Sequence, residues 1–131
     1  MEGAPLLAEA TSADAICVAM RKIAEMLPVA DVVTYTTSGS TSLRAARERF
    51  TPPIVSMTPS LATARRLALV WGVHSVRTRD VADVSEMVDD ACSTALERRF
   101  AKAGDTIVIT AGMPFGTPGA TNLLRIAQIP A

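Results

Sequence analysis

The chain has 131 residues, of which 49% are hydrophobic and 20% charged, and this balance is typical of one folded domain with a full core. Its 13 basic residues match 13 acidic ones, and only 4% of its residues are aromatic. Nucleic acid is therefore not an expected partner, because neither excess positive charge nor a base-stacking platform is present. No segment approaches the roughly 20 apolar residues of a membrane span. The N-terminus lacks a signal-peptide pattern, so we expect a cytoplasmic protein without membrane contact.

The first half of the chain predicts a leader followed by alternating helices and strands. Residues 1–10 show no pattern and are expected to be the leader. Apolar residues at helical spacing predict a helix from Thr11 or Ser12 to about residue 27. A β-branched run predicts a strand over residues 32–36. A helix over residues 43–49 and a strand over residues 54–57 follow.

The second half continues the alternation and ends in two consecutive strands. The expected order is a helix over residues 60–71, a strand over 73–76, a helix from a capping box at Asp83 and Glu86 to Gly104, and strands over 106–110 and 123–129. No helix separates the last two strands, so they are expected to pair antiparallel.

This order predicts an α/β fold with three layers, α/β/α, around a mixed five-stranded sheet. The sheet is expected to be mostly parallel, with the antiparallel last strand at an edge. Residues 11–131 form one domain in this interpretation.

A run of hydroxyl residues after the first strand is the main candidate site. Its members are Thr36, Thr37, Ser38, Gly39, Ser40 and Thr41. A helix start offers backbone N–H groups and a positive dipole end, the hydroxyls add neutral donors, and Gly39 permits close approach, so the run is suited to bind a phosphate. The alternative is that the hydroxyls only cap the next helix. The run lacks the lysine and the spacing of a Walker loop.

The loop between the last two strands is the second candidate. Residues 111–121 are rich in glycine and proline and include Gly116, Thr117, Pro118 and Gly119. Both loops follow the carboxyl ends of strands, where ligands of open α/β sheets bind, so they are expected to close over one ligand. The alternative is a long hairpin connection.

The remaining polar and aromatic candidates favour ordinary structural roles. Arg44 is within reach of an anion at the helix start, whereas Arg47 is expected to be solvated. His74 is interpreted as structural, and Trp71 as part of the core or of an interface.

The two cysteines, Cys17 and Cys92, fall on apolar helical positions and are expected to be buried and reduced. One histidine and two distant cysteines do not build a metal site, and no pair of nucleophile and base is visible. The sequence therefore favours binding over catalysis.

Several separated motifs resemble, in the same order, the C-terminal domain of bacterial pyruvate kinases. They are the run 36–41, Pro52-Pro53-Ile54-Val55, and the segments 64–73, 104–112 and 119–123. The similarity extends from about residue 11 to residue 129.

The resemblance implies a regulatory and oligomerising domain of a glycolytic enzyme that converts phosphoenolpyruvate and ADP to pyruvate and ATP. The catalytic residues of that family, with Mg²⁺ and usually K⁺, lie in a barrel outside this chain, so we expect no cofactor and no activity here. Thr36–Thr41 then binds a phosphate of a sugar-phosphate or nucleotide effector, and Gly116–Gly119 belongs to the covering loop. Homo-oligomers are expected to form through the helices and the last strand.

One departure from the family concerns charge. Some family members carry a basic residue inside the phosphate loop, at a position where this chain has Thr37 or Ser40. Less positive charge implies weaker phosphate affinity or a different effector. A free-standing binding module for a phosphorylated metabolite and a small α/β enzyme remain as alternatives.

Overall fold

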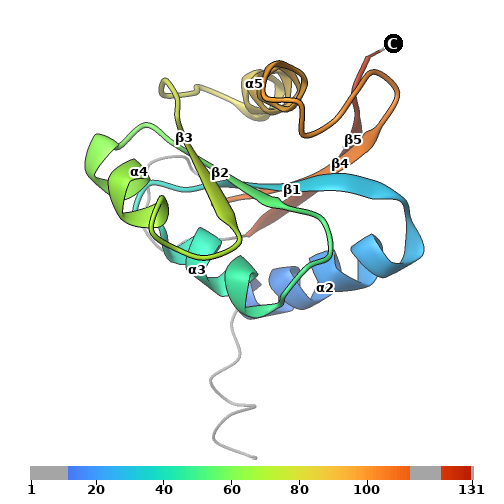
Figure 1. The fold of residues 1–131 in the computed structure, drawn as a ribbon, viewed down its shortest axis with the longest axis horizontal. Coiled ribbons are helices and arrows are strands. Elements are labelled where there is room, and N and C mark those ends of the chain that lie inside the picture. Colours follow the sequence, from blue (N-terminus) through green and yellow to red (C-terminus); the bar gives the residue numbers. More distant parts are fainter. Residues whose placement is uncertain (1–11, 113–121, 131) are drawn as a thin grey trace, which may run out of the picture.

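The fold is described from a computed structural model, which covers residues 12–112 and 122–130 (Figure 1). The elements are α2 (Ser12–Met26), β1 (Val29–Tyr35), α3 (Ser40–Arg47), β2 (Ile54–Thr58), α4 (Leu61–Leu67), β3 (Val73–Arg77), α5 (Val84–Glu97), β4 (Thr106–Ala111) and β5 (Leu123–Gln128). The predicted order of helices and strands is confirmed.

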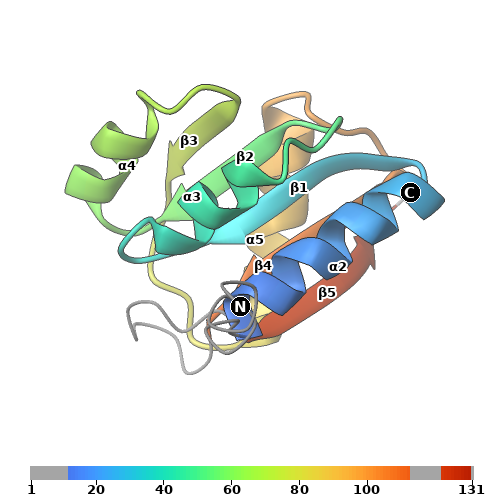
Figure 2. The same ribbon diagram turned by 90° about the horizontal axis from the view of Figure 1, so that it is seen from below.

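The five strands form one sheet in the order β3-β2-β1-β4-β5. The pairs β1–β2, β1–β4 and β2–β3 are parallel, whereas β4 and β5 are antiparallel. Helices α2 and α3 cover one face and α5 covers the other (Figures 1 and 2). The predicted three-layer fold with an antiparallel edge strand is therefore confirmed.

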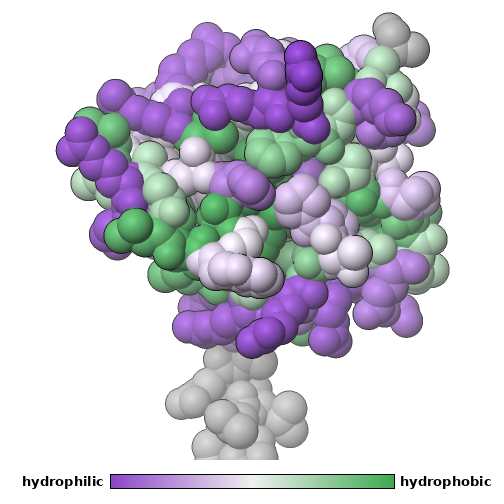
Figure 3. Space-filling model, in the orientation of Figure 1, coloured by the Kyte–Doolittle hydropathy of each residue, from purple (hydrophilic) through white to green (hydrophobic). Residues whose placement is uncertain are grey.

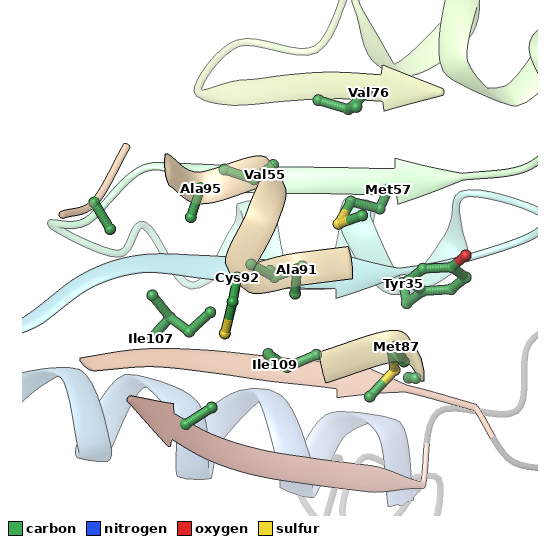
Figure 4. Close-up of a cluster of buried hydrophobic side chains, with 14 of the residues drawn as sticks. Tyr35, Val55, Met57, Val76, Met87, Ala91, Cys92, Ala95, Ile107 and Ile109 are labelled. Atoms are coloured by element: carbon green, nitrogen blue, oxygen red, sulfur yellow. The ribbon is translucent and has the colours of Figure 1, made fainter. Parts of the chain in front are cut away.

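Each face of the sheet has its own core. Under α5, the side chains of Met87, Ala91, Cys92 and Ala95 pack against those of the strands, as Figure 4 shows for Tyr35, Val55, Met57, Ile107 and Ile109. On the opposite face, Cys17 and Met20 of α2, Ala45 of α3 and Leu67 of α4 pack against Val32, Ile54 and Val108.

Both cysteines are free and buried, as predicted. Burial raises the pKa of the Cys17 thiol to about 11, and it also raises the pKa of Cys92. The two thiols are therefore protonated at neutral pH, and act as small apolar groups of the core.

Two predicted helices end too late. Helix α4 ends at Leu67 rather than near residue 71, because the N–H groups of Leu69 and Val70 bond to carbonyls only three residues back. Helix α5 ends at Glu97 rather than at Gly104. There Arg99 adopts a positive φ of 61°, which breaks the helical path.

Two elements begin earlier than predicted. Strand β1 starts at Val29 and α3 at Ser40, where the sequence indicated residues 32 and 43. Asp31 and the run of hydroxyl residues disfavour strand and helix by propensity, and tertiary packing overrides this preference.

Trp71 is not part of the core, since its side chain is 91% exposed. His74 is exposed, and its ring packs against Phe100 with centroids 4.9 Å apart. Its interpretation as a structural residue agrees with this contact.

Candidate functional site

The hydroxyl run joins the central strand β1 to α3 at the carboxyl end of the strand. From β1 the chain continues through α3 to β2 on one side, while β4 pairs with β1 on the other side. Such a reversal of strand order leaves a crevice outside the carboxyl ends, where open α/β sheets bind ligands. Tyr35 and Ala111, the last residues of β1 and β4, are register partners, so the two candidate loops leave the sheet side by side.

The second candidate loop is described only at its ends. Gly116, Thr117, Pro118 and Gly119 lie outside the described residues, and their role in covering an effector stays a prediction.

Gly39 shapes the turn between β1 and α3. It has a φ of +95°, and its N–H donates a hydrogen bond of 2.8 Å to the hydroxyl of Thr36. A Cβ added to Gly39 would lie 3.4 Å from the Cγ2 of Thr63 and 3.5 Å from a methyl group of Leu67. The turn therefore requires glycine for its backbone conformation, and α4 packs closely over it.

The hydroxyl run divides into an inner and an outer set. Thr36 and Thr41 are buried, at 5% and 4% exposure, and the oxygen of Thr36 already accepts the bond from Gly39. Ser38 and Ser40 are half-buried, and the hydroxyl of Ser38 donates to that of Ser40 over 3.2 Å. The outer set, which includes half-buried Thr37, is accessible to a ligand at the start of α3.

A chain of three buried hydroxyls anchors α3 to the sheet. The Ser42 hydroxyl lies between those of Thr34 on β1 and Ser56 on β2, and the Thr34–Ser42 distance is 2.7 Å. All three residues have 0% exposure. Because each hydroxyl both donates and accepts, this chain satisfies polar groups that packing removes from water.

Arg66 brings positive charge to the loop from another element. Its Nη2 donates to the carbonyl of Ser38 and to the hydroxyl of Thr63, each over 3.1 Å. The Thr63 hydroxyl in turn donates to the carbonyl of Thr37 over 2.8 Å. No ion pair with a carboxylate occupies Arg66 among the described residues.

Sequence reasoning did not single out Arg66, because 27 positions separate it from Gly39 in the chain (66 − 39). The available signal was topological. Helix α4 follows β2, the neighbour of β1, so this short helix begins at the same sheet edge as α3 and carries Arg66 in its last turn.

Arg44 forms an ion pair with another helix. Its Nη1 lies 2.6 Å from Oδ1 of Asp14, so the guanidinium ties α3 to the start of α2. Tyr35, on the α5 side of β1, donates its hydroxyl to the carbonyl of Arg79 over 2.7 Å. Burial raises the pKa of Tyr35 to about 12, which keeps the phenol neutral.

A cavity of about 570 Å³ lies at the opposite end of α3 from Gly39. Its lining includes Leu43, Arg47, Phe50, Val70 and Trp71. Figure 3 shows hydrophobic surface in the middle of the displayed face, between polar bands over α5 and along the bottom. The cavity was not anticipated from the sequence, because its lining comes from separate segments around α3 and after α4.

The described part of the chain has neither a cluster of metal ligands nor a membrane-spanning helix. Within residues 12–112 and 122–130, no three His, Cys, Asp or Glu side chains are grouped as a metal site. The dependence on Mg²⁺ and K⁺ stays a prediction for the barrel of a longer enzyme. None of the helices in these same residues has the length and apolar character needed to cross a membrane.

The sequence matches known proteins along nearly its whole length. The family described as "Pyruvate kinase, alpha/beta domain" matches residues 14–127. The chain belongs to this family. The pyruvate kinase of Methylorubrum extorquens is 47% identical to it over 121 residues, and that of Geobacillus stearothermophilus is 41% identical over 121 residues. A pyruvate kinase of Agrobacterium vitis is 42% identical over 117 residues.

These relatives are much longer than the match. The alignments cover 92%, 92% and 89% of this chain but 25%, 21% and 24% of the respective relatives. This pyruvate kinase α/β domain thus spans about a quarter or less of the relatives that it matches.

Proposed function

We propose that this domain regulates and helps to assemble a pyruvate kinase, and that it binds a phosphorylated effector at the start of α3. The main support for this proposal is that the outer hydroxyls and Arg66 lie together at the carboxyl ends of the central strands. The enzyme's transfer of phosphate from phosphoenolpyruvate to ADP would occur in the catalytic part, which this chain does not include.

The chemistry of the loop suits a phosphate. The first turn of an α-helix leaves N–H groups without intrahelical acceptors, and the helix dipole is positive there. The hydroxyls of Ser38 and Ser40 add donors, and Arg66 supplies a charge that the loop itself lacks. A guanidinium binds phosphate oxygens through paired, charge-assisted hydrogen bonds. A sugar phosphate or a nucleoside monophosphate is the expected effector.

Regulation follows if the effector binds one arrangement of the full enzyme better than another. The population then shifts toward that arrangement by the difference between the two binding free energies. The chain by itself is expected to have no pyruvate kinase activity.

Binding is tested by thermal unfolding with a panel of sugar phosphates and nucleoside monophosphates at millimolar concentration. A ligand at ten times its Kd should raise the Tm by about 5 °C, since the gain is about 1.4 kcal/mol. The double variant Ser38→Ala/Ser40→Ala should lose most of this rise, because it removes the outer hydroxyls.

The matched control is Ser85→Ala/Ser93→Ala, which changes two exposed serines of α5, on the opposite face of the sheet from α3. It should keep the full rise. A panel that leaves the Tm unchanged would contradict the proposal, and an equal rise in both double variants would place the site elsewhere.

A further inference from the structure

Asp31 is the most unusual buried group of the described chain. Its side chain has 0% exposure, and neither carboxylate oxygen has a hydrogen-bond partner among the described residues. It lies at a register shift of β1, where Val29 pairs with Thr106 but Asp31 pairs with Ile107. Leaving a buried carboxylate without any partner is costly, so an acid at this position calls for an explanation.

The other described carboxylates that form bonds have evident structural roles. Asp14 pairs with Arg44, Asp90 pairs with Arg79, and Asp83 caps α5. Asp31 does none of these things, which separates it from acids that hold elements together.

The surroundings of Asp31 oppose its ionised form. Side chains alternate along a strand, so Asp31 shares the α5 face of the sheet with Val33 and Tyr35. Among the described titratable groups, the carboxylate of Asp105, in the α5–β4 connection, acts on Asp31, and Asp31 in turn raises the pKa of the Cys92 thiol on α5. No basic side chain of the described residues forms a hydrogen bond or an ion pair with Asp31. Burial, and then the negative charge of Asp105, raise the pKa of Asp31 to about 6.

The carboxylate of Asp105 is itself engaged locally. Its Oδ2 accepts the backbone N–H of Lys102 over 2.9 Å, which fixes the turn after α5. The negative charge near Asp31 is thus held in place by the fold.

We propose that the protonation of Asp31 controls the stability of this domain: its neutral acid form fits the packed interface between α5 and the sheet, and its ionisation destabilises that interface. The direction follows from linkage. The folded chain retains a proton that the unfolded chain releases at about pH 4, so stability falls as the pH rises from about 4 through 6 and then levels off. Mild acid therefore tightens the domain.

Thermal unfolding at pH 5 and pH 7 tests the proposal. The Tm of the unmodified chain should be lower at pH 7 by about 5 °C because of Asp31. Asp31→Asn, a neutral mimic of the protonated acid, should lose this decrease. The control Asp80→Asn removes an exposed carboxylate and should retain it. An equal pH dependence in all three proteins would overturn the proposal.

A direct titration keeps the test valid if Asp31→Asn does not fold. The side-chain carboxyl carbon of Asp31, followed by ¹³C NMR in the unmodified chain, should titrate with a midpoint near pH 6. A midpoint near pH 4, as in an exposed aspartate, would refute the proposal.

Discussion

Arg66 illustrates how a single residue can change the chemistry of a loop to which it does not belong. The hydroxyl run carries no basic residue, yet α4 places a guanidinium on the carbonyl of Ser38. The loop has no positive charge of its own, but Arg66 of the neighbouring helix α4 supplies one.

Replacing Arg66 tests whether its positive charge contributes to effector binding. Under the proposed function, Arg66→Ala should weaken binding of the effector identified in the panel about tenfold, because a charge-assisted hydrogen bond is lost. Arg66→Lys should restore part of the affinity by its charge. Isothermal titration calorimetry measures both Kd values.

Arg65→Ala is the control, since Arg65 is an exposed neighbour on the same helix. Equal Kd values for Arg66→Ala and Arg65→Ala would show that the guanidinium of Arg66 does not contact the effector.

For the individual residues of the loop, the sequence predicted the types of hydrogen-bond donor but not how deeply each side chain is buried. The sequence predicts one phosphate loop of six consecutive residues, whereas in the structure Thr36 and Thr41 are buried and Ser38 and Ser40 are half-buried. The burial of each hydroxyl depends on contacts with segments distant in the chain, such as α4 against Gly39, and no local pattern contains those contacts.

Helix α3 shows how an element is fixed by polar as well as apolar contacts. It has only eight residues, too few to be stable alone, and Ser42 joins it to β1 and β2 through buried hydroxyls. Sequence periodicity located its apolar half but missed its first turn, because serine and threonine favour caps over helix interiors.

Ser42→Ala should therefore lower the free energy of unfolding by about 1–3 kcal/mol, because it removes the common partner of the Thr34 and Ser56 hydroxyls. Urea unfolding followed by circular dichroism measures the change. Ser40→Ala, at a half-buried position of the same helix, should change it by no more than about 0.5 kcal/mol. Similar losses of unfolding free energy in the two variants would show that the hydroxyl chain does not anchor α3.

For the whole molecule, the sequence predicted the layers and the edge strand well. Alternating helices and strands encode a parallel sheet, and the missing helix before β5 encodes its antiparallel pairing. The large cavity at the C-terminal half of α3 was not predictable, because it lies between segments that only the fold brings together.

The β5 edge carries a prediction about assembly. Its outer side has no strand partner in the sheet, and Ile126 is 46% exposed. If copies of the chain associate along this edge, as proposed for the full enzyme, Ile126→Lys should shift the population to monomers, because the charge opposes burial. Size-exclusion chromatography with light scattering measures the mass.

Ile126→Val preserves the apolar character of the edge and should preserve association. A chain that is monomeric before any substitution, or an Ile126→Lys variant that still associates, would rule out this edge as the contact.

The exposed position of Trp71 has a practical consequence for spectroscopy. It is the single tryptophan of the chain, and it lies at the cavity rather than in either core. Its fluorescence therefore reports on what covers that surface: a partner that excludes water there shifts the emission to the blue, whereas unfolding barely changes it. The fluorescence of Trp71 is thus a natural probe of association at this surface that responds little to unfolding.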